Sequence, residues 1–207
     1  MISLFIDTSS SDVSIAIVKD NQILSNINKN IPNEHSIYTT SFLDNALNEA
    51  KITPNDINKI MVVNGPGSFT GVRIGVTIAK VFAYLKKIDI ICISSLKMRA
   101  ISTKHDNCLV LLDAKHDNYY IGLYDKDNNE IIKEQFNNKT KIKEIIKKYN
   151  PICISDKNLF IDDIKVQKSN LDIKKIVSYY INKEPINCHL VVPNYLKLPQ
   201  ALEQQKW

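Results

Sequence analysis

Hydrophobic residues occur in short, regularly spaced blocks over the first half of the chain. Compact apolar runs predict strands at Ser3–Ile6, Val13–Val18 and Ile23–Ile27, with the turn KDNQ between the last two. Apolar residues then recur with helical spacing over Ser36–Ala50, which predicts an amphipathic helix. The β-rich run Ile60–Val63 predicts a fourth strand.

A glycine-rich stretch separates this fourth strand from a second long helix. The stretch NGPGSFTGVRIG holds four of the five glycines of the chain: Gly65, Gly67, Gly71 and Gly75. The helix is predicted over Gly71–Leu85, followed by a buried strand at Ile90–Ile93 and a further helix that starts in SSLKMRAIST.

The pattern then begins again. FIDTSSSDVSIAIVKDN, from Phe5, aligns with LLDAKHDNYYIGLYDKD, from Leu111, so that Asp7 falls on Asp113 and Ile15 on Ile121 at one constant spacing. A third strand and a helix follow each copy. We therefore predict an α/β protein of two duplicated βββαβα lobes with mixed sheets, divided into an N-terminal lobe, 1–103, and a C-terminal lobe, 104–207.

The glycine stretch differs from the usual phosphate-binding motifs. A dinucleotide fingerprint belongs on the first strand of its unit and needs an acidic residue after the next strand, which here ends in Ser94 and Ser95. The Gly-Lys-Ser/Thr of a Walker A loop is missing. We instead predict a sharp turn in which Gly65 or Gly67 has positive φ. Ser68 and Thr70 are candidate helix N-caps.

The Gly71–Leu85 helix is apolar over two faces. At 100° per residue, one stripe is predicted to face the core: Ile74, Ile78, Val81, Phe82 and Leu85. Small residues recur every fourth position on a second face: Gly71, Gly75, Ala79 and Ala83. Small side chains at this spacing allow another helix to approach closely. That neighbour is either the Ser36–Ala50 helix of the same chain or another subunit, and both could hold.

Candidate catalytic residues are few. No two of the four histidines have the spacing of a helical metal-binding pair. His189 is predicted to pack in the core within a strand, and His35 to lie at a helix entry. Asp7 and Asp113 each end a buried strand, as do metal- and phosphate-binding aspartates of duplicated ATP-binding folds. The hairpins that follow them lack glycine, so we expect nucleotide binding to be weakened or lost.

Composition and charge fit a cytoplasmic globular protein. The net charge is +5, and the densest lysine cluster lies on the polar side of a predicted helix at Lys141–Tyr149. No window is long and apolar enough to span a membrane. The four cysteines form no CxxC pair and are expected to be buried, reduced thiols.

Five segments together resemble the bacterial TsaB family, also called YeaZ: IDTSSSDVSIAIV, NGPGSFTGVRIGVTIAK, ISSLKMRA, LLDAKHDNYYIGLY and VPNYLKLPQA. The family motif GPGSFTGxRIG is present in full from Gly65 to Gly75. Two positions depart from the usual family pattern: Lys197 stands in place of an arginine, and Asn118 in place of an acidic residue. The tail is short and ends at Trp207.

The resemblance implies an actin-like ATPase (ASKHA, ribonuclease H-like) fold and a subunit without catalysis or a cofactor of its own. It implies pairing with the catalytic subunit TsaD and cooperation with the ATPase TsaE. This machinery makes N6-threonylcarbamoyladenosine next to the anticodon in tRNAs that decode ANN codons. The tRNA would be contacted only through the complex, and the chain alone would form a homodimer.

In the TsaB family, which this sequence resembles, the partner surface is the helical face of the first lobe. We therefore expect the partner interface at Tyr38, Phe42, Gly71, Gly75 and Ala79. The motif loop comprises Asn64, Gly65, Pro66, Gly67, Ser68, Phe69 and Thr70. If the small stripe is an interface, Gly75→Leu abolishes pairing while the monomer stays folded.

Two other classes of function remain open at this point. One is an active actin-fold enzyme, an ATP-dependent kinase or a metallopeptidase-like protein, that uses Asp7 and Asp113. The other is a direct RNA binder that uses the lysine-rich second lobe.

Overall fold

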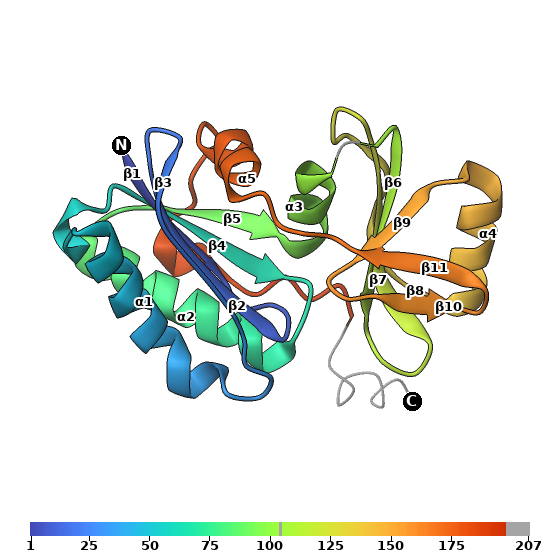
Figure 1. Cartoon of the computed structure of the whole chain (residues 1–207), viewed down its shortest axis with the longest axis horizontal. Helices are drawn as coiled ribbons and strands as arrows, with labels where there is room; N and C mark the ends of the chain where they lie inside the picture. The colour runs from blue at the N-terminus through green and yellow to red at the C-terminus, as the bar shows by residue number, and fades with distance from the viewer. Residues whose placement is uncertain (104, 198–207) are drawn as a thin grey trace.

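The computed structural model describes residues 1–103 and 105–197 and contains two sheets side by side, with helices outside and between them (Figure 1). The tail, with the end of the VPNYLKLPQA segment, lies outside the described residues. No helix of the described part is long and apolar enough to cross a membrane.

The first sheet has the strand order β3-β2-β1-β4-β5. β1 pairs antiparallel with β2 and parallel with β4, so the sheet is mixed, as predicted. Its elements are β1 (Ile2–Asp7), β2 (Asp12–Lys19), β3 (Gln22–Asn30), α1 (His35–Ala50), η1 (Pro54–Asp56), β4 (Lys59–Gly65), α2 (Phe69–Lys86), β5 (Ile90–Ser94) and α3 (Ser95–Ser102).

The second sheet repeats this plan with the order β10-β11-β9-β6-β7-β8. The two units differ after their fourth strand. In the first unit, α2 and β5 follow β4 and lead to α3. In the second unit, the hairpin β10–β11 follows β9 and leads to α5. The elements are β6 (Asn107–Asp113), β7 (Asn118–Asp125), β8 (Glu130–Asn138), α4 (Lys139–Tyr149), β9 (Ile152–Ser155), β10 (Leu159–Ile161), β11 (Ile164–Lys168), α5 (Ile173–Tyr180) and η2 (Cys188–Leu190). The recurrence of three antiparallel strands, a helix and a parallel strand on the far side of the first is the actin-like ATPase fold.

Local chemistry sets the boundaries of these elements. The β2–β3 turn has Asp20 and Asn21 at positive φ, a conformation that these two residue types tolerate best after glycine. α1 ends where Lys51 takes left-handed geometry. Asn138 caps α4 and Asp172 caps α5 through side-chain oxygens that accept backbone N–H bonds.

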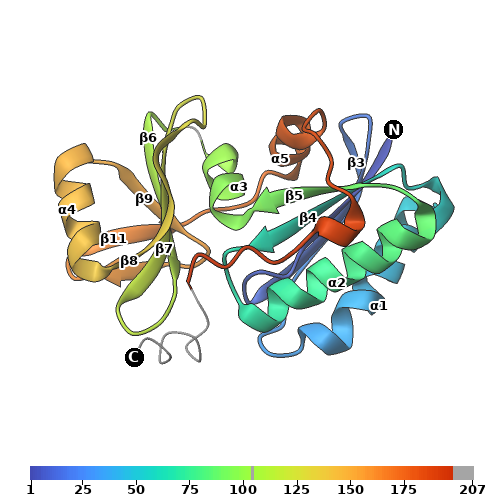
Figure 2. The ribbon, with the colours of Figure 1, turned by 180° about the vertical axis from the view of Figure 1, so that it is seen from behind.

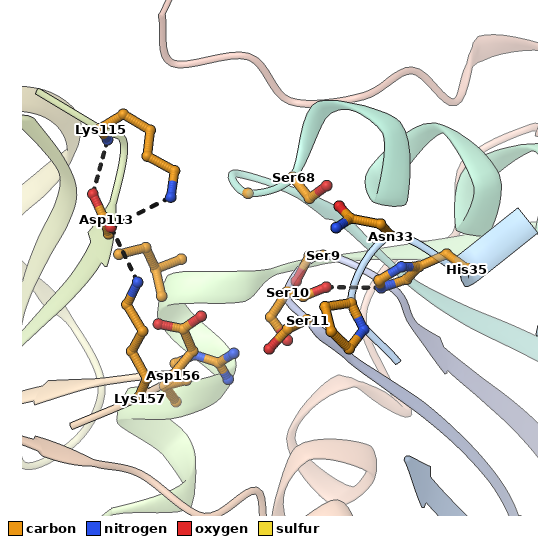
Figure 3. Close-up of a pocket in the computed structure, with 14 residues that line it drawn as sticks. Ser9, Ser10, Ser11, Asn33, His35, Ser68, Asp113, Lys115, Asp156 and Lys157 are labelled. Atoms are coloured by element: carbon orange, nitrogen blue, oxygen red, sulfur yellow. Dashed lines mark hydrogen bonds and ion pairs between the residues drawn. The ribbon is translucent and has the colours of Figure 1, made fainter. Parts of the chain in front are cut away.

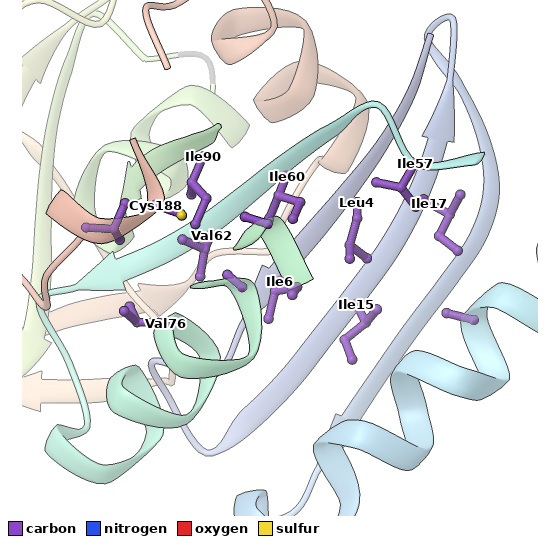
Figure 4. Packing of buried hydrophobic residues seen from close by; sticks show 14 of the residues in the cluster. Leu4, Ile6, Ile15, Ile17, Ile57, Ile60, Val62, Val76, Ile90 and Cys188 are labelled. Carbon is purple, nitrogen blue, oxygen red and sulfur yellow. The ribbon is translucent and has the colours of Figure 1, made fainter. Parts of the chain in front are cut away.

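The helices form layers around the sheets. α1 and α2 lie side by side on one face of the first sheet (Figures 1 and 2). Between them and the strands is a core of aliphatic side chains (Figure 4), among them Leu4, Ile6, Ile15, Val62 and Val76. α4 covers the outer face of the second sheet, where Ile142 and Ile145 are buried. Its lysines lie on the polar side, as expected, and two of them, Lys139 and Lys143, form ion pairs with Asp162.

Two helices, α3 and α5, cover the other face of the first sheet, and α3 also contacts the second sheet. α5 packs on the first sheet, although it follows the strands of the second in sequence. α3 contributes Met98 and Ile101 to that same cluster and Leu96 and Ala100 to the core of the second sheet. All four cysteines are free thiols, and burial raises the pKa of Cys92 and of Cys153 to about 11. The thiols of Cys92 and Cys153 therefore stay protonated and unreactive at neutral pH.

A partly buried carboxylate links the two sheets at α3. The hydroxyl groups of Ser94 and Tyr124 both donate to Oε1 of Glu134, on β8. Burial raises the pKa of the Glu134 carboxyl above its usual 4.5, and the two hydrogen bonds act in the opposite direction. The native state therefore holds this proton more tightly than the unfolded chain does.

We expect Glu134→Gln to stabilise the chain at pH 7. A glutamine carbonyl oxygen can accept both hydroxyl donors and carries no charge. Because the native pKa is raised, the wild type loses stability as the pH rises from about 4.5 through the raised pKa, and the variant does not. Its advantage should therefore disappear at acidic pH. Urea unfolding across pH 4–8 measures this, with Glu184→Gln, an exposed carboxyl after α5, as the control. An advantage that is equal at all pH values would contradict the assignment.

Candidate functional site

The glycine-rich loop wraps the connection between β1 and β2. A Cβ on Gly67 would lie 2.3 Å from the Ser9 carbonyl oxygen, and one on Gly71 would lie 2.0 Å from the Thr8 carbonyl oxygen. The Ser68 N–H donates to the Ser9 carbonyl at 2.7 Å. Gly65 has φ +117°, which settles which glycine takes positive φ. The close neighbour that requires glycine here is thus the chain's own backbone.

Ser68 is the N-cap of α2, as predicted, and its hydroxyl accepts the Gly71 N–H at 3.2 Å. Thr70, the other candidate, lies inside the first turn. The capping bond fixes the direction in which α2 leaves the loop.

The segment before the tail holds the loop from the other side. The Asn194 N–H donates to the Asn64 carbonyl at 2.7 Å, and Arg73 Nε donates to the Tyr195 hydroxyl at 2.7 Å. Tyr195 also stacks on Phe69, with ring centroids 5.3 Å apart. This role could not be predicted from the sequence, because nothing in the spacing of VPNYLK shows which loop the segment contacts.

The orientation predicted for α2 is wrong. Its small residues, not its large ones, face the first sheet: Gly71, Gly75, Ala79 and Ala83 are buried. A Cβ on Gly75 would lie 2.4 Å from the Thr8 hydroxyl oxygen. The small side chains let the helix backbone lie close to the end of β1. Gly71, Gly75 and Ala79 therefore serve the core and offer no side chain to a partner.

A second side of α2, about 100° around the helix from the small residues, carries large apolar residues. Val81 is 54% exposed and Leu85 is 70% exposed. Ile74 and Ile78 precede them on the same helical stripe and are half-buried.

The neighbouring helix α1 exposes Ile37, at 64%, and Tyr38, at 40%. Because the two helices run in the same direction, this end of α1 lies beside the first turns of α2 (Figures 1 and 2). Tyr38 is stacked on the half-buried Phe42 with centroids 6.0 Å apart. We call this surface the α1–α2 apolar face, formed by Ile37, Tyr38, Phe42, Ile74, Ile78, Val81 and Leu85. Of the predicted interface residues, it retains Tyr38 and Phe42.

Asp7 and Asp113 end equivalent strands and make equivalent turns. Each Oδ1 accepts, at 2.8 Å, the N–H of the second residue after it, Ser9 and Lys115 respectively. The constant spacing predicted for the two hairpins is nevertheless wrong beyond this point. Ile6 pairs with Ile15 in the first hairpin, whereas Leu112 pairs with Tyr120 in the second. The second connection is therefore one residue shorter.

The two aspartates also have different surroundings. Burial raises the pKa of Asp7, which is 2% exposed, and the nearby charge of Arg99 opposes this. For Asp113, burial is outweighed by bonds from the Lys115 N–H and Lys157 Nζ, and its pKa is lowered. No cluster of three or more potential metal-ligating side chains occurs in the part of the chain that the structure describes.

A cavity of about 320 Å³ lies between the two sheets. Figure 3 shows Ser9, Ser10, Ser68 and His35 on one wall, opposite Asp113, Lys115 and Lys157. Asp113 lines this cavity, whereas Asp7 lines a smaller one of about 70 Å³ next to it. The two carboxylates therefore do not converge on one site.

His35 lies at a helix entry, as predicted, whereas the prediction that His189 packs in a core strand is wrong. His35 is the first residue of α1 and is buried, and its Nε2 donates to the Ser10 carbonyl at 2.8 Å. His189 is exposed and lies in the 3₁₀ helix η2 rather than in a core strand. It contacts the edge of Tyr84 at 5.5 Å between centroids.

Comparison with known proteins identifies the family. The protein of Bacillus subtilis (strain 168) named tRNA threonylcarbamoyladenosine biosynthesis protein TsaB is 30% identical to this chain over 226 residues. The match covers 100% of this chain and 98% of that protein. The chain belongs to the TsaB family.

The same comparison relates this TsaB-family chain to TsaD. The family described as TsaD: tRNA N6-adenosine threonylcarbamoyltransferase matches residues 22–173. The Fusobacterium nucleatum protein named tRNA N6-adenosine threonylcarbamoyltransferase is 36% identical to this chain over 124 residues. That match covers 51% of this chain and 36% of that protein. The solved structure of an uncharacterized Pseudomonas aeruginosa protein with similarity to peptidase YeaZ has the same fold. Its TM-score is 0.79 at 18% identity, over 95% of this chain and 99% of that one.

Proposed function

We propose that this chain is the non-catalytic partner of a TsaD-type catalytic subunit in the formation of N6-threonylcarbamoyladenosine in tRNA. Membership of the TsaB family supports the role in this modification. A TsaE-type ATPase completes the machinery, and the target is the adenosine next to the anticodon of tRNAs that decode ANN codons. The tRNA is reached through the complex, which is cytoplasmic, and this chain supplies no cofactor.

The observation that carries the proposal is the α1–α2 apolar face. Two neighbouring helices expose large apolar side chains on the side away from their own sheet, with Val81 and Leu85 more than half exposed. Exposed apolar surface of this extent is typical of interaction sites. Similarity to TsaD over much of the chain implies that TsaD has corresponding helices. Two related subunits can therefore pair through equivalent faces about a pseudo-twofold axis.

The division into a partner-binding lobe, 1–103, and a second lobe, 104–207, belongs to this proposal. The exposed face lies wholly on the first lobe. Without TsaD, the same face allows two copies of this chain to form a homodimer.

The test is reconstitution with the TsaD and TsaE subunits of the same organism. Light scattering should show a one-to-one complex of this chain with TsaD. Threonylcarbamoylation of an ANN-decoding tRNA should fall to background when this chain is omitted. If the chain does not associate with TsaD but turns over ATP alone, and Asp7→Ala abolishes the turnover, it is an independent enzyme. Salt-dependent tRNA binding by the chain alone would instead favour direct RNA recognition.

A further inference from the structure

The stretch 186–195, which follows α5 and includes η2, returns to the first sheet and runs beside α2 (Figure 2). We call it the η2 segment. Lys80, on α2, donates from Nζ to the carbonyl oxygens of His189 and Val191 at 3.3 and 2.8 Å. The Val191 side chain is 2% exposed and belongs to the core of the first sheet. These contacts fix the segment against the helix.

The η2 segment nevertheless exposes large apolar side chains. Leu190 is 71% exposed and Val192 is 64% exposed, although the Val192 carbonyl is itself held by Asn64 Nδ2 at 3.0 Å. Tyr84, on α2, is 62% exposed and meets the ring of His189 edge-on. Since hydrogen bonds already fix the backbone that carries these side chains, a partner that covers them has little chain to order.

A groove joins the η2 segment to the α1–α2 apolar face. Its volume is about 520 Å³, and it lies between the last turns of α2 and η2. Leu85, a member of the α1–α2 apolar face, lines the groove together with Tyr84 and Cys188. The two charged residues of the lining, Lys87 and Asp89, have opposite signs and offset each other. The groove is therefore suited to an apolar side chain rather than to a charged one.

We propose that the η2 segment is part of the surface that binds the TsaD-type subunit, and that this subunit places an apolar side chain in the groove. Interfaces draw much of their affinity from a few such anchors seated in pockets. Because Leu85 belongs to both surfaces, a subunit that covers the α1–α2 apolar face also reaches the groove.

The inference rests on the proposed function and adds to it. The η2 segment lies outside residues 22–173, the part of the chain that matches the TsaD family. The groove is therefore a contact in addition to the pairing of equivalent helices. The partner surface then includes residues beyond the lobe 1–103.

The first test is the binding of Leu190→Glu to the immobilised TsaD subunit of the same organism, measured by surface plasmon resonance. The affinity should fall about ten-fold or more, because the new carboxylate would be desolvated without a partner. Since Leu190 is mostly exposed, the thermal midpoint of the free chain should stay unchanged. Phe160→Glu, 68% exposed on β10, is the matched control and should bind as the wild type does. Unchanged affinity in Leu190→Glu, or an equal loss in the control, overturns the inference.

Val192→Glu repeats the test at the second exposed position and decides the matter if Leu190→Glu does not fold. Light scattering of the variants alone tests a second copy of this chain as the occupant. Loss of self-association with TsaD binding intact would assign the segment to that homodimer and overturn the inference. If Val81→Glu/Leu85→Glu loses TsaD binding while both η2 variants keep it, the proposed function stands and the inference fails. If the wild-type chain does not bind TsaD, both fail.

Discussion

Gly71→Ala is expected to destabilise the chain by about 3 kcal/mol or more, although alanine is the better helix former. The new Cβ would lie 2.0 Å from the Thr8 carbonyl oxygen, a backbone atom held in the connection between β1 and β2. Either α2 or this connection must move, and both belong to the main core. A domain of this size has a total stability of about 5–15 kcal/mol. Thermal unfolding should therefore show a midpoint roughly 6–12 °C lower.

Thr70→Ala is the matched control, since it lies next to Gly71 in the same turn but is exposed. It should shift the midpoint little. Gly75→Leu should also unfold the chain, because even a Cβ there would meet the Thr8 side chain at 2.4 Å. This reverses the expectation from the sequence that the variant stays folded and fails only to pair. A folded Gly71→Ala protein with wild-type stability would show that α2 does not approach β1 this closely.

The double substitution Val81→Glu/Leu85→Glu is expected to weaken binding to the TsaD subunit by about 100-fold or more while leaving the monomer folded. Both side chains are more than half exposed, so the free energy of unfolding should change little. In a complex that uses the α1–α2 apolar face, both side chains would be desolvated. Each buried, unpaired carboxylate would weaken the affinity by about ten-fold or more, so the two together account for the expected loss. Surface plasmon resonance with immobilised TsaD measures the loss.

Phe160→Glu is the control for this pair. Phe160 is 68% exposed, close to the 70% of Leu85, but lies on β10 of the second sheet. It should leave TsaD binding and tRNA modification unchanged. Equal losses in the control and the double variant would mean that the α1–α2 face is not the specific interface. Retained pairing in the double variant would place the partner elsewhere on the molecule.

The sequence by itself determined most of the local structure. Spacing of apolar residues located most of the predicted strands and helices to within a few residues, because each element buries one side and so repeats at its own period. The strand predicted around His189 is the exception, since this residue lies in η2. The strand, turn and glycine signals also gave the duplicated lobes. Ser68 as N-cap and the need for a left-handed glycine at Gly65 or Gly67 followed from chain geometry alone. The motif from Gly65 to Gly75 was specific enough to indicate the family.

Only the tertiary structure decided which way α2 faces. Its sequence is apolar around much of the circumference, so periodicity could not distinguish the side packed on the sheet from the side left exposed. The decision depends on how closely the helix can approach β1, and Gly71 and Gly75 set that distance because they have no side chain to hold the two backbones apart. The same limit applies to Arg99 and to Asn194, whose surroundings come from segments distant in sequence. A one-dimensional pattern specifies what each residue prefers to bury, and the fold alone specifies what it is buried against.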